Sequence, residues 1–173
     1  MTDAQDALEA LTALVPDFPE PGILFRDLTP VFANGDALLA IAEELSDVDV
    51  EFDVVAGVEA RGFVLAAAVA LASGTGVLLI RKAGKLPRPD HQREYALEYG
   101  TATLELQAGH LAPGTRVLLV DDVLATGGTL AAASGLCHDA GLEVVGIGVA
   151  VELSELGGRT LLGDLPITVL QSV

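Results

Sequence analysis

The sequence has 173 residues, of which 51% are hydrophobic, with 19 glycines, 8 prolines and no tryptophan. This length supports one domain with a sizeable core and is too short for two ordinary domains, so we expect a single domain over residues 1–173. No apolar run reaches the roughly 20 residues of a membrane span, and no basic-then-apolar leader opens the chain. We therefore expect a cytoplasmic protein with no membrane partner.

The charge balance excludes another class of partner. A net charge of −16, from 25 acidic and 9 basic residues, repels nucleic acid. Five of the nine basic residues nevertheless lie within one short segment, at Arg81, Lys82, Lys85, Arg88 and Arg93. Such a segment is either a solvated charged loop or a site for a small polyanion such as a diphosphate. In so acidic a protein we favour the polyanion.

The first third of the chain predicts two helices separated by an irregular segment. Apolar residues at helical spacing run from Ala4 to Val15, and Pro16 ends that helix. Residues 15–30 contain four prolines, which exclude regular helix and predict an ordered, irregular segment. Asn34 is then expected to cap a helix that continues to Leu45.

The rest of the chain alternates short apolar runs with helical stretches, which is typical of parallel βαβ units. We expect strands at residues 53–58, 76–80, 116–120 and 144–151, and helices at residues 62–72 and 128–140. Residues 81–95 are expected to form a mobile loop, and alternating residues in 95–106 are expected to form a β-hairpin at its base. Cys137 is the chain's one cysteine, which excludes an internal disulfide and a zinc site and predicts a half-buried residue on a helix.

The most informative motif covers residues 117–129, VLLVDDVLATGGT. A buried strand ends in Asp121 and Asp122, and a loop of small residues leads directly into a helix. Ligands of open parallel sheets bind at the carboxyl ends of strands. The backbone N–H groups and hydroxyls of residues 125–129 suit a phosphate at a helix N-terminus, and the two carboxylates suit vicinal sugar hydroxyls. The motif thus predicts a sugar phosphate site.

The alternative interpretation is a strand-end turn followed by an ordinary helix cap, which a pattern of thirteen residues makes much the weaker one. Two other nucleotide motifs are absent. The chain contains no Gly-x4-Gly-Lys-[Ser/Thr], and no Gly-x-Gly string continues to a third glycine that opens a helix after a strand. ATPase and dinucleotide functions are therefore disfavoured.

Residues 117–129 resemble the phosphoribosyl-diphosphate signature of the type I phosphoribosyltransferases. Four further segments, in order, resemble the adenine-specific members of that family: FPEPGILFRD at 18–27, GVEARGF at 57–63, RKAGKLP at 81–87 with LEYG at 97–100, and VELSELGGR at 151–159. The resemblance implies an α/β fold, a doubly wound parallel sheet of about five strands. A small hood would be built from the Pro-rich segment and a C-terminal strand at residues 167–170.

The resemblance also implies a role for each matching residue. The 5′-phosphate would be held by Ala125, Thr126, Gly127, Gly128 and Thr129, and ribose hydroxyls by Asp121 and Asp122. The diphosphate would be met by Arg61 and Gly62, and covered by Lys82, Lys85 and, more weakly, Arg81. The closing loop would supply Glu98 as proton acceptor and Tyr99. Adenine would contact Leu24, Phe25, Arg26 and Val123, where Val123 replaces a leucine common in relatives.

The implied reaction converts adenine and 5-phosphoribosyl 1-diphosphate into AMP and diphosphate. Mg²⁺ would be bound mainly through substrate oxygens and water, with no residue as a direct metal ligand, and the resemblance implies a homodimer. For two of these residues a purely structural role is the alternative: Arg26 as a partner of Asp27, and Glu98 as a solvent-facing strand residue. A non-catalytic sensor of phosphoribosyl diphosphate is the competing function. The acidic surface and the presence of Arg61, Lys82, Lys85 and Glu98 disfavour it.

Overall fold

The computed structural model of the chain describes residues 3–96 and 101–173. Its N-terminal third contains three helices and a two-stranded antiparallel sheet, with α1 (Ala4–Leu11), β1 (Ala13–Pro16), β2 (Leu24–Asp27), α2 (Thr29–Phe32) and α3 (Gly35–Ser46). The predicted first helix is too long. The chain leaves helical geometry at Thr12, and the residues before Pro16 pair with β2 instead. The Asn34 cap is confirmed, because its side chain accepts a hydrogen bond of 3.0 Å from the N–H of Ala37.

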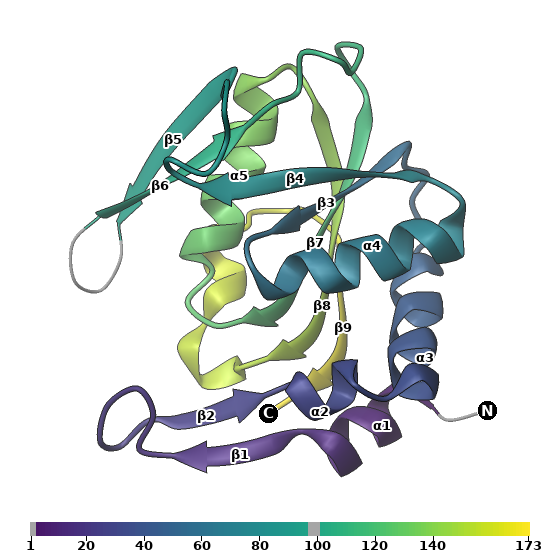
Figure 1. Cartoon of the computed structure of the whole chain (residues 1–173), viewed down its shortest axis with the longest axis vertical. Helices are drawn as coiled ribbons and strands as arrows, with labels where there is room; N and C mark the ends of the chain where they lie inside the picture. Colours follow the sequence, from purple (N-terminus) through teal and green to yellow (C-terminus); the bar gives the residue numbers. More distant parts are fainter. Residues whose placement is uncertain (1–2, 97–100) are drawn as a thin grey trace.

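The central sheet has seven strands in the order β5-β6-β4-β3-β7-β8-β9 (Figure 1). Five of them are parallel: β4 (Gly76–Lys82), β3 (Val54–Val58), β7 (Arg116–Leu124), β8 (Glu143–Glu152) and β9 (Ile167–Ser172). The expected parallel sheet is thus confirmed. The expected place of the C-terminal strand is wrong, because β9 pairs with β8 at the sheet edge and the hood is the β1–β2 hairpin alone.

Strands β5 (His91–Ala96) and β6 (Thr101–Leu106) form an antiparallel hairpin that joins the sheet through β4. The hairpin begins four residues before the predicted one and β4 extends to Lys82, so seven of the fifteen residues of the expected loop are strand. The Cα register pairs Arg93 with Leu104 and Tyr95 with Ala102.

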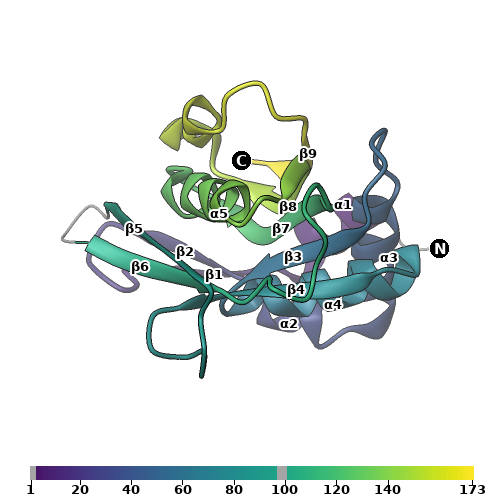
Figure 2. The same cartoon turned by 90° about the horizontal axis from the view of Figure 1, so that it is seen from above.

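Helices cover both faces of the sheet (Figure 2). Alternation along β7 sends Val117 and Leu119 into the core under α5 (Gly128–Asp139), and Leu118 and Val120 into the core under α3 and α4 (Arg61–Ser73). Two short 3₁₀ helices, η1 (Ser154–Leu156) and η2 (Gly158–Leu161), link β8 to β9. Cys137 is fully buried in α5, and this burial raises the pKa of its thiol to about 12.

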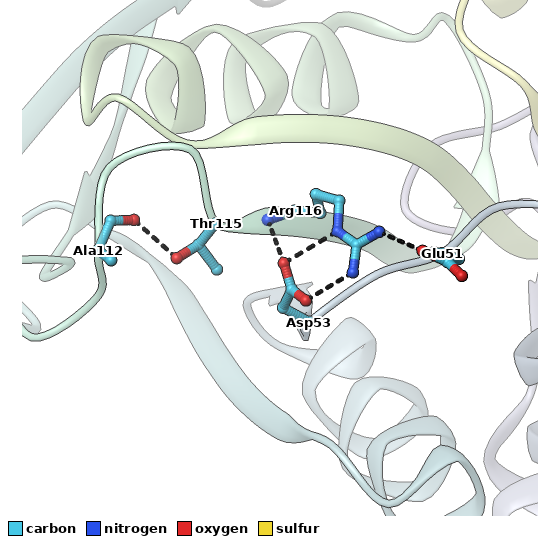
Figure 3. Close-up of polar contacts among 5 residues, drawn as sticks. All are labelled: Glu51, Asp53, Ala112, Thr115 and Arg116. Atoms are coloured by element: carbon cyan, nitrogen blue, oxygen red, sulfur yellow. Dashed lines mark hydrogen bonds and ion pairs between the residues drawn. The ribbon is translucent and has the colours of Figure 1, made fainter.

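The amino ends of β3 and β7 are joined by a charged cluster at the edge of the sheet far from the strands' carboxyl ends (Figure 3). Both the backbone N–H and the guanidinium of Arg116 donate to Asp53, at 2.8–3.1 Å, and Nη1 donates to Glu51 at 2.7 Å. These hydrogen bonds from Arg116 lower the pKa of Asp53 to about 2. The cluster fixes the register at which the two strands start.

Asp53→Asn is expected to lower the unfolding midpoint at pH 7. The pKa of Asp53 falls from 3.8 to about 2 on folding, so its charge stabilises the fold fully above pH 4 and progressively less as pH drops towards 2. The difference from wild type should therefore shrink between about pH 4 and pH 2. Urea unfolding at several pH values measures it. Asp49→Asn is the matched control, because exposed Asp49 has no side-chain hydrogen bond or ion pair within residues 3–96 and 101–173. A pH-independent difference would contradict the assignment.

Candidate functional site

An open cavity of about 640 Å³ lies at the carboxyl ends of β3 and β7. The hood closes one side of it through residues of β2, and the β5–β6 hairpin supplies another wall. Ten predicted site residues line it: Leu24, Phe25, Arg26, Arg61, Lys82, Asp121, Asp122, Val123, Ala125 and Thr129. These ten residues come from four of the five motif segments, and Leu153 of the fifth segment also lines the cavity.

A smaller pocket of about 80 Å³ opens at the first turn of α5 and is lined by Asp121 and residues 123–130. It contains all five residues predicted to hold a phosphate. No side chain in the described part of the chain caps α5, and the first N–H groups of a helix have no partner within the helix. These groups, together with the helix dipole, favour an anion in this pocket.

Gly127 gives this loop its shape. Its φ of +82° is left-handed, and a Cβ at this position would collide with the carbonyl oxygen of Gly158 in η2. Gly158 is equally constrained, because its own Cβ would meet the carbonyl of Ala125. The contact between the two glycines is a support that sequence reasoning missed. The sequence feature that could have indicated this contact is the pair Gly157-Gly158 within the last matched segment.

A second uncapped helix start adjoins the cavity at α4. Ala60 is the N-cap residue of α4, and no side chain caps this helix among the described residues. Ala60 and Arg61 line the cavity. Gly57 and Gly62 allow close packing here, since a Cβ on Gly57 would lie 2.7 Å from the carbonyl oxygen of Gly62. Gly62 itself is buried against Asp121, with 2.8 Å between its ideal Cβ position and Asp121 Oδ1. It does not line the cavity.

The two carboxylates at the end of β7 differ in their surroundings. Asp122 is buried and its Oδ2 lies 2.8 Å from Nε of Arg61. Asp121 accepts a hydrogen bond of 2.9 Å from the N–H of Asp122. Burial, and then the neighbouring charge of Asp122, raise the pKa of Asp121 well above the ordinary aspartate value. One carboxylate is thus balanced by a cation, and the other binds protons more readily.

Phe25 connects the hood to this ion pair. Its ring packs edge-on against Phe18 at 5.0 Å between centroids, and Arg61 Cζ lies 5.2 Å from the centre of the Phe25 ring. The alternative pairing of Arg26 with Asp27 is not found. The carboxylate of Asp27 instead accepts hydrogen bonds from the N–H and the hydroxyl of Thr29, at 2.9 and 2.6 Å. Arg26 instead lines the cavity.

The cationic segment does not act as one patch. Lys82 lines the cavity, whereas Lys85 is exposed and does not. Nε of Arg81 lies 3.4 Å from Oε2 of Glu59, and the guanidinium stacks on the ring of Phe63. Its Nη1 donates to the carbonyl of Lys85 at 3.1 Å. Arg81 therefore shapes the turn after β4 rather than lining the cavity.

Two cavity residues with polar side chains escaped the sequence analysis, Glu59 and Tyr95. Burial opposes the charge of Glu59, but hydrogen bonds from the N–H of Lys82 and from Arg81 outweigh burial and lower its pKa. Glu59 lies within the matched GVEARGF segment, which was its signal. Tyr95 carried no signal, because its position depends on the hairpin. Glu98 and Tyr99 lie outside the described residues.

The same described residues contain no helix long and apolar enough to cross a membrane. Within them, no three His, Cys, Asp or Glu side chains are grouped to hold a metal ion. Glu152 and Arg159 form a two-point ion pair at 2.7 and 2.9 Å beside the Gly158 turn.

Gly127→Ala is expected to abolish binding of ribose 5-phosphate, because the added methyl group displaces Gly158 and with it the anion pocket. Gly114→Ala is the matched control: its φ of +79° carries the same backbone strain, but its Cβ would have no neighbour within 4 Å. The control should lose about 1 kcal/mol of stability and keep ligand affinity. Calorimetric titration and thermal unfolding measure both. Equal affinities in the two variants would contradict the role of the glycine contact.

Comparison with known proteins identifies the family. A family model described as "Phosphoribosyl transferase domain" matches residues 31–160. The adenine phosphoribosyltransferase of Clavibacter michiganensis is 62% identical over 91% of this chain and 90% of its own length. The crystal structure of adenine phosphoribosyltransferase from Thermoanaerobacter pseudethanolicus matches with a TM-score of 0.93 and 38% identity, covering 98% of this chain and 99% of that one. That from Giardia lamblia, complexed with 9-deazaadenine, matches with a TM-score of 0.92 and 39% identity, over 100% and 99%. This chain therefore belongs to the phosphoribosyltransferase family, and within it to the adenine phosphoribosyltransferases.

Proposed function

We propose that the protein transfers the 5-phosphoribosyl group of 5-phosphoribosyl 1-diphosphate to N9 of adenine, giving AMP and diphosphate in purine salvage. The observation that carries this function is the junction at the end of β7, where an anion pocket adjoins the cavity that holds the carboxylate pair, with Asp121, Ala125 and Thr129 lining both. Curated relatives with 62% and 61% identity carry the name of this enzyme. The crystal structure of adenine phosphoribosyltransferase from Saccharomyces cerevisiae, which is 34% identical to this chain, is described as a complex with adenine and a bisphosphate.

The phosphoribosyl group is assigned to the β7–α5 turn. Residues 125–129 would bind the 5′-phosphate through the N–H groups at the start of α5. Asp121 and Asp122 would accept hydrogen bonds from two ribose hydroxyls. This arrangement holds the anomeric carbon at a fixed height above the sheet, which lowers the entropic cost of the reaction.

The leaving diphosphate is assigned to the α4 side of the cavity. Arg61 has five N–H donors, and its Nε contact with Asp122 leaves the Nη groups for diphosphate oxygens. Gly62 would contribute through the start of α4. Lys82 would reach the same oxygens from β4, and Lys85 and Arg81 would follow when the segment 81–87 closes. Their positive charges would stabilise the charge that develops on the leaving group.

Adenine is assigned to the hood side, between Phe25 and Val123, with Leu24 and Arg26 beside it. In the reaction, N9 forms a bond to the anomeric carbon as the bond from that carbon to the diphosphate oxygen breaks. The proton on N9 passes to Glu98, and Tyr99 would cover the site from the same loop. No protein nucleophile takes part, so the catalytic effect rests on positioning, charge and exclusion of water.

Mg²⁺ fits this site as a companion of the substrate. The carboxylates of Asp121 and Asp122 offer oxygen atoms, but Asp122 is already paired with Arg61 and no third ligand lies with them in the described part of the chain. Such a donor set suits an ion held mainly by diphosphate oxygens and water. When bound, the ion neutralises charge on the diphosphate.

The homodimer and the cytoplasmic location are also part of the proposal. Exposed apolar side chains on α4 and on β4 beside it support a dimer, because they would be covered by a second copy: Val64, Leu71, Val77 and Leu79. The acidic surface and the chain's one buried cysteine suit a cytoplasmic protein.

Replacing Asp121 and Asp122 together by asparagine should lower kcat/KM for 5-phosphoribosyl 1-diphosphate by at least about a hundredfold, because the ribose loses both charged acceptors. Asparagine keeps the shape of each side chain, so the fold should persist. Steady-state kinetics and circular dichroism measure the two effects. Asp49→Asn controls for loss of one acidic surface charge. A kcat/KM near that of wild type would rule out the sugar role.

Adenine should react with a kcat/KM at least about a hundredfold above that of hypoxanthine. The chain has two lysines, both in the segment 81–93, so no lysine on a late strand can read a 6-oxo group. Strand β2 pairs with β1 alone in the described chain and lines the cavity, so its backbone groups can read the 6-amino group and N1. A mismatched base leaves such groups unpaired. Formation of AMP and IMP gives the ratio, and similar rates would contradict readout by the backbone.

A further inference from the structure

Arg93 is the last basic residue of the cationic segment, and it pairs with a residue of α5. It stands on β5, on the same face as Tyr95 two residues later. Tyr95 lines the main cavity, and so do Ala102 and Leu104 of the partner strand β6. Arg93 does not line it, and instead borders a separate groove beside the second half of α5. Binding of diphosphate therefore does not explain the contacts of Arg93.

The guanidinium of Arg93 crosses α5 at Gly135. Its Nη1 donates to Asp139 at 2.6 Å, one turn further along the helix. A Cβ on Gly135 would lie 2.7 Å from Nε and 2.9 Å from Nη1 of Arg93. Glycine inside a helix is unfavourable relative to alanine, and here its position is explained by the side chain that lies across it. Arg93, Gly135 and Asp139 together form what we call the hairpin clasp.

The clasp connects two parts of the proposed site, the anion pocket and the β5–β6 hairpin, through one helix. The first turn of α5 lines the anion pocket, and its second half holds β5 through Arg93. The β5–β6 hairpin carries Tyr95 on the cavity wall and leads directly into the segment with Glu98 and Tyr99. Fixing β5 on α5 therefore sets the cavity wall, and the base of the closing loop, at a constant distance from the bound phosphate.

We propose that Arg93 is a positioning residue for phosphoribosyl transfer, acting through the hairpin clasp without touching the substrates. The proposal rests on the proposed function for its kinetic consequence. The ion pair is partly exposed, with both side chains 43% accessible, and exposed pairs are individually weak. The effect is accordingly a loss of alignment rather than of the fold, on the order of 3- to 5-fold in kcat/KM.

Gly135→Ala separates positioning from stability. The methyl group forces the guanidinium of Arg93 out of its place, while alanine favours the helix. We expect an unfolding midpoint equal to or above that of wild type, faster hydrogen exchange of the amides of residues 91–95, and a kcat/KM lowered about 3- to 5-fold. Arg93→Ala should give the same exchange and kinetics, and Arg93→Lys should recover part of both, because its ammonium can still reach Asp139. Glu94→Gln, at an exposed β5 neighbour with no side-chain hydrogen bond or ion pair within residues 3–96 and 101–173, should leave exchange and kinetics unchanged.

The double variant Arg93→Ala with Gly135→Ala should be no slower than Arg93→Ala alone, because both changes remove one interaction. Additive losses, or wild-type exchange and kinetics in Gly135→Ala, would overturn the clasp. Hydrogen exchange needs no turnover, so it tests the clasp even if the wild-type protein forms no AMP. Failure of the proposed function and failure of the clasp are thereby distinguished.

Discussion

The ion pair between Arg61 and Asp122 joins three parts of the molecule at one point. Arg61 begins α4, Asp122 lies near the end of β7, and the guanidinium also stacks on Phe25 of the hood. A buried carboxylate without a counter-charge would be costly at this position. Because Arg61 balances it, β7 can end in two adjacent aspartates beside a site that must accept a highly charged phosphate ester. The hood, the sheet and the α4 turn are held together at that point.

Local pairing also explains how so acidic a chain keeps cations for its ligand. Within residues 3–96 and 101–173, five of the nine basic side chains form ion pairs: Arg61, Arg81, Arg93, Arg116 and Arg159. Arg116 and Arg159 fix strand ends, and Arg93 fixes the hairpin on α5. Within the described residues, Lys82 is a cation that lines the cavity without an ion pair. The cationic segment is thus divided between architecture and binding, which counting charges along the sequence does not reveal.

The sequence predicted most of the sheet because parallel strands are buried on both faces and appear as continuous apolar runs. It predicted the anion pocket because a strand, small residues and a helix start are all local features. Errors arose where long-range pairing decides the conformation. The residues before Pro16 form a strand because β2 is available, and β9 extends the sheet because β8 has a free edge. The glycine pair at 157–158 was visible in the sequence, but the contact that Gly158 makes was not, since it depends on a loop more than thirty residues earlier in the chain.

The burial of Cys137 has a practical consequence for studying the closing segment. A thiol that is inaccessible, with its pKa raised to about 12, stays unreactive towards maleimides at neutral pH. The natural sequence therefore serves as a cysteine-free background. A single cysteine substituted on the β5–β6 hairpin would carry a fluorophore or spin label at that place alone, and the proposed closure of the segment could be tested during turnover without replacing Cys137.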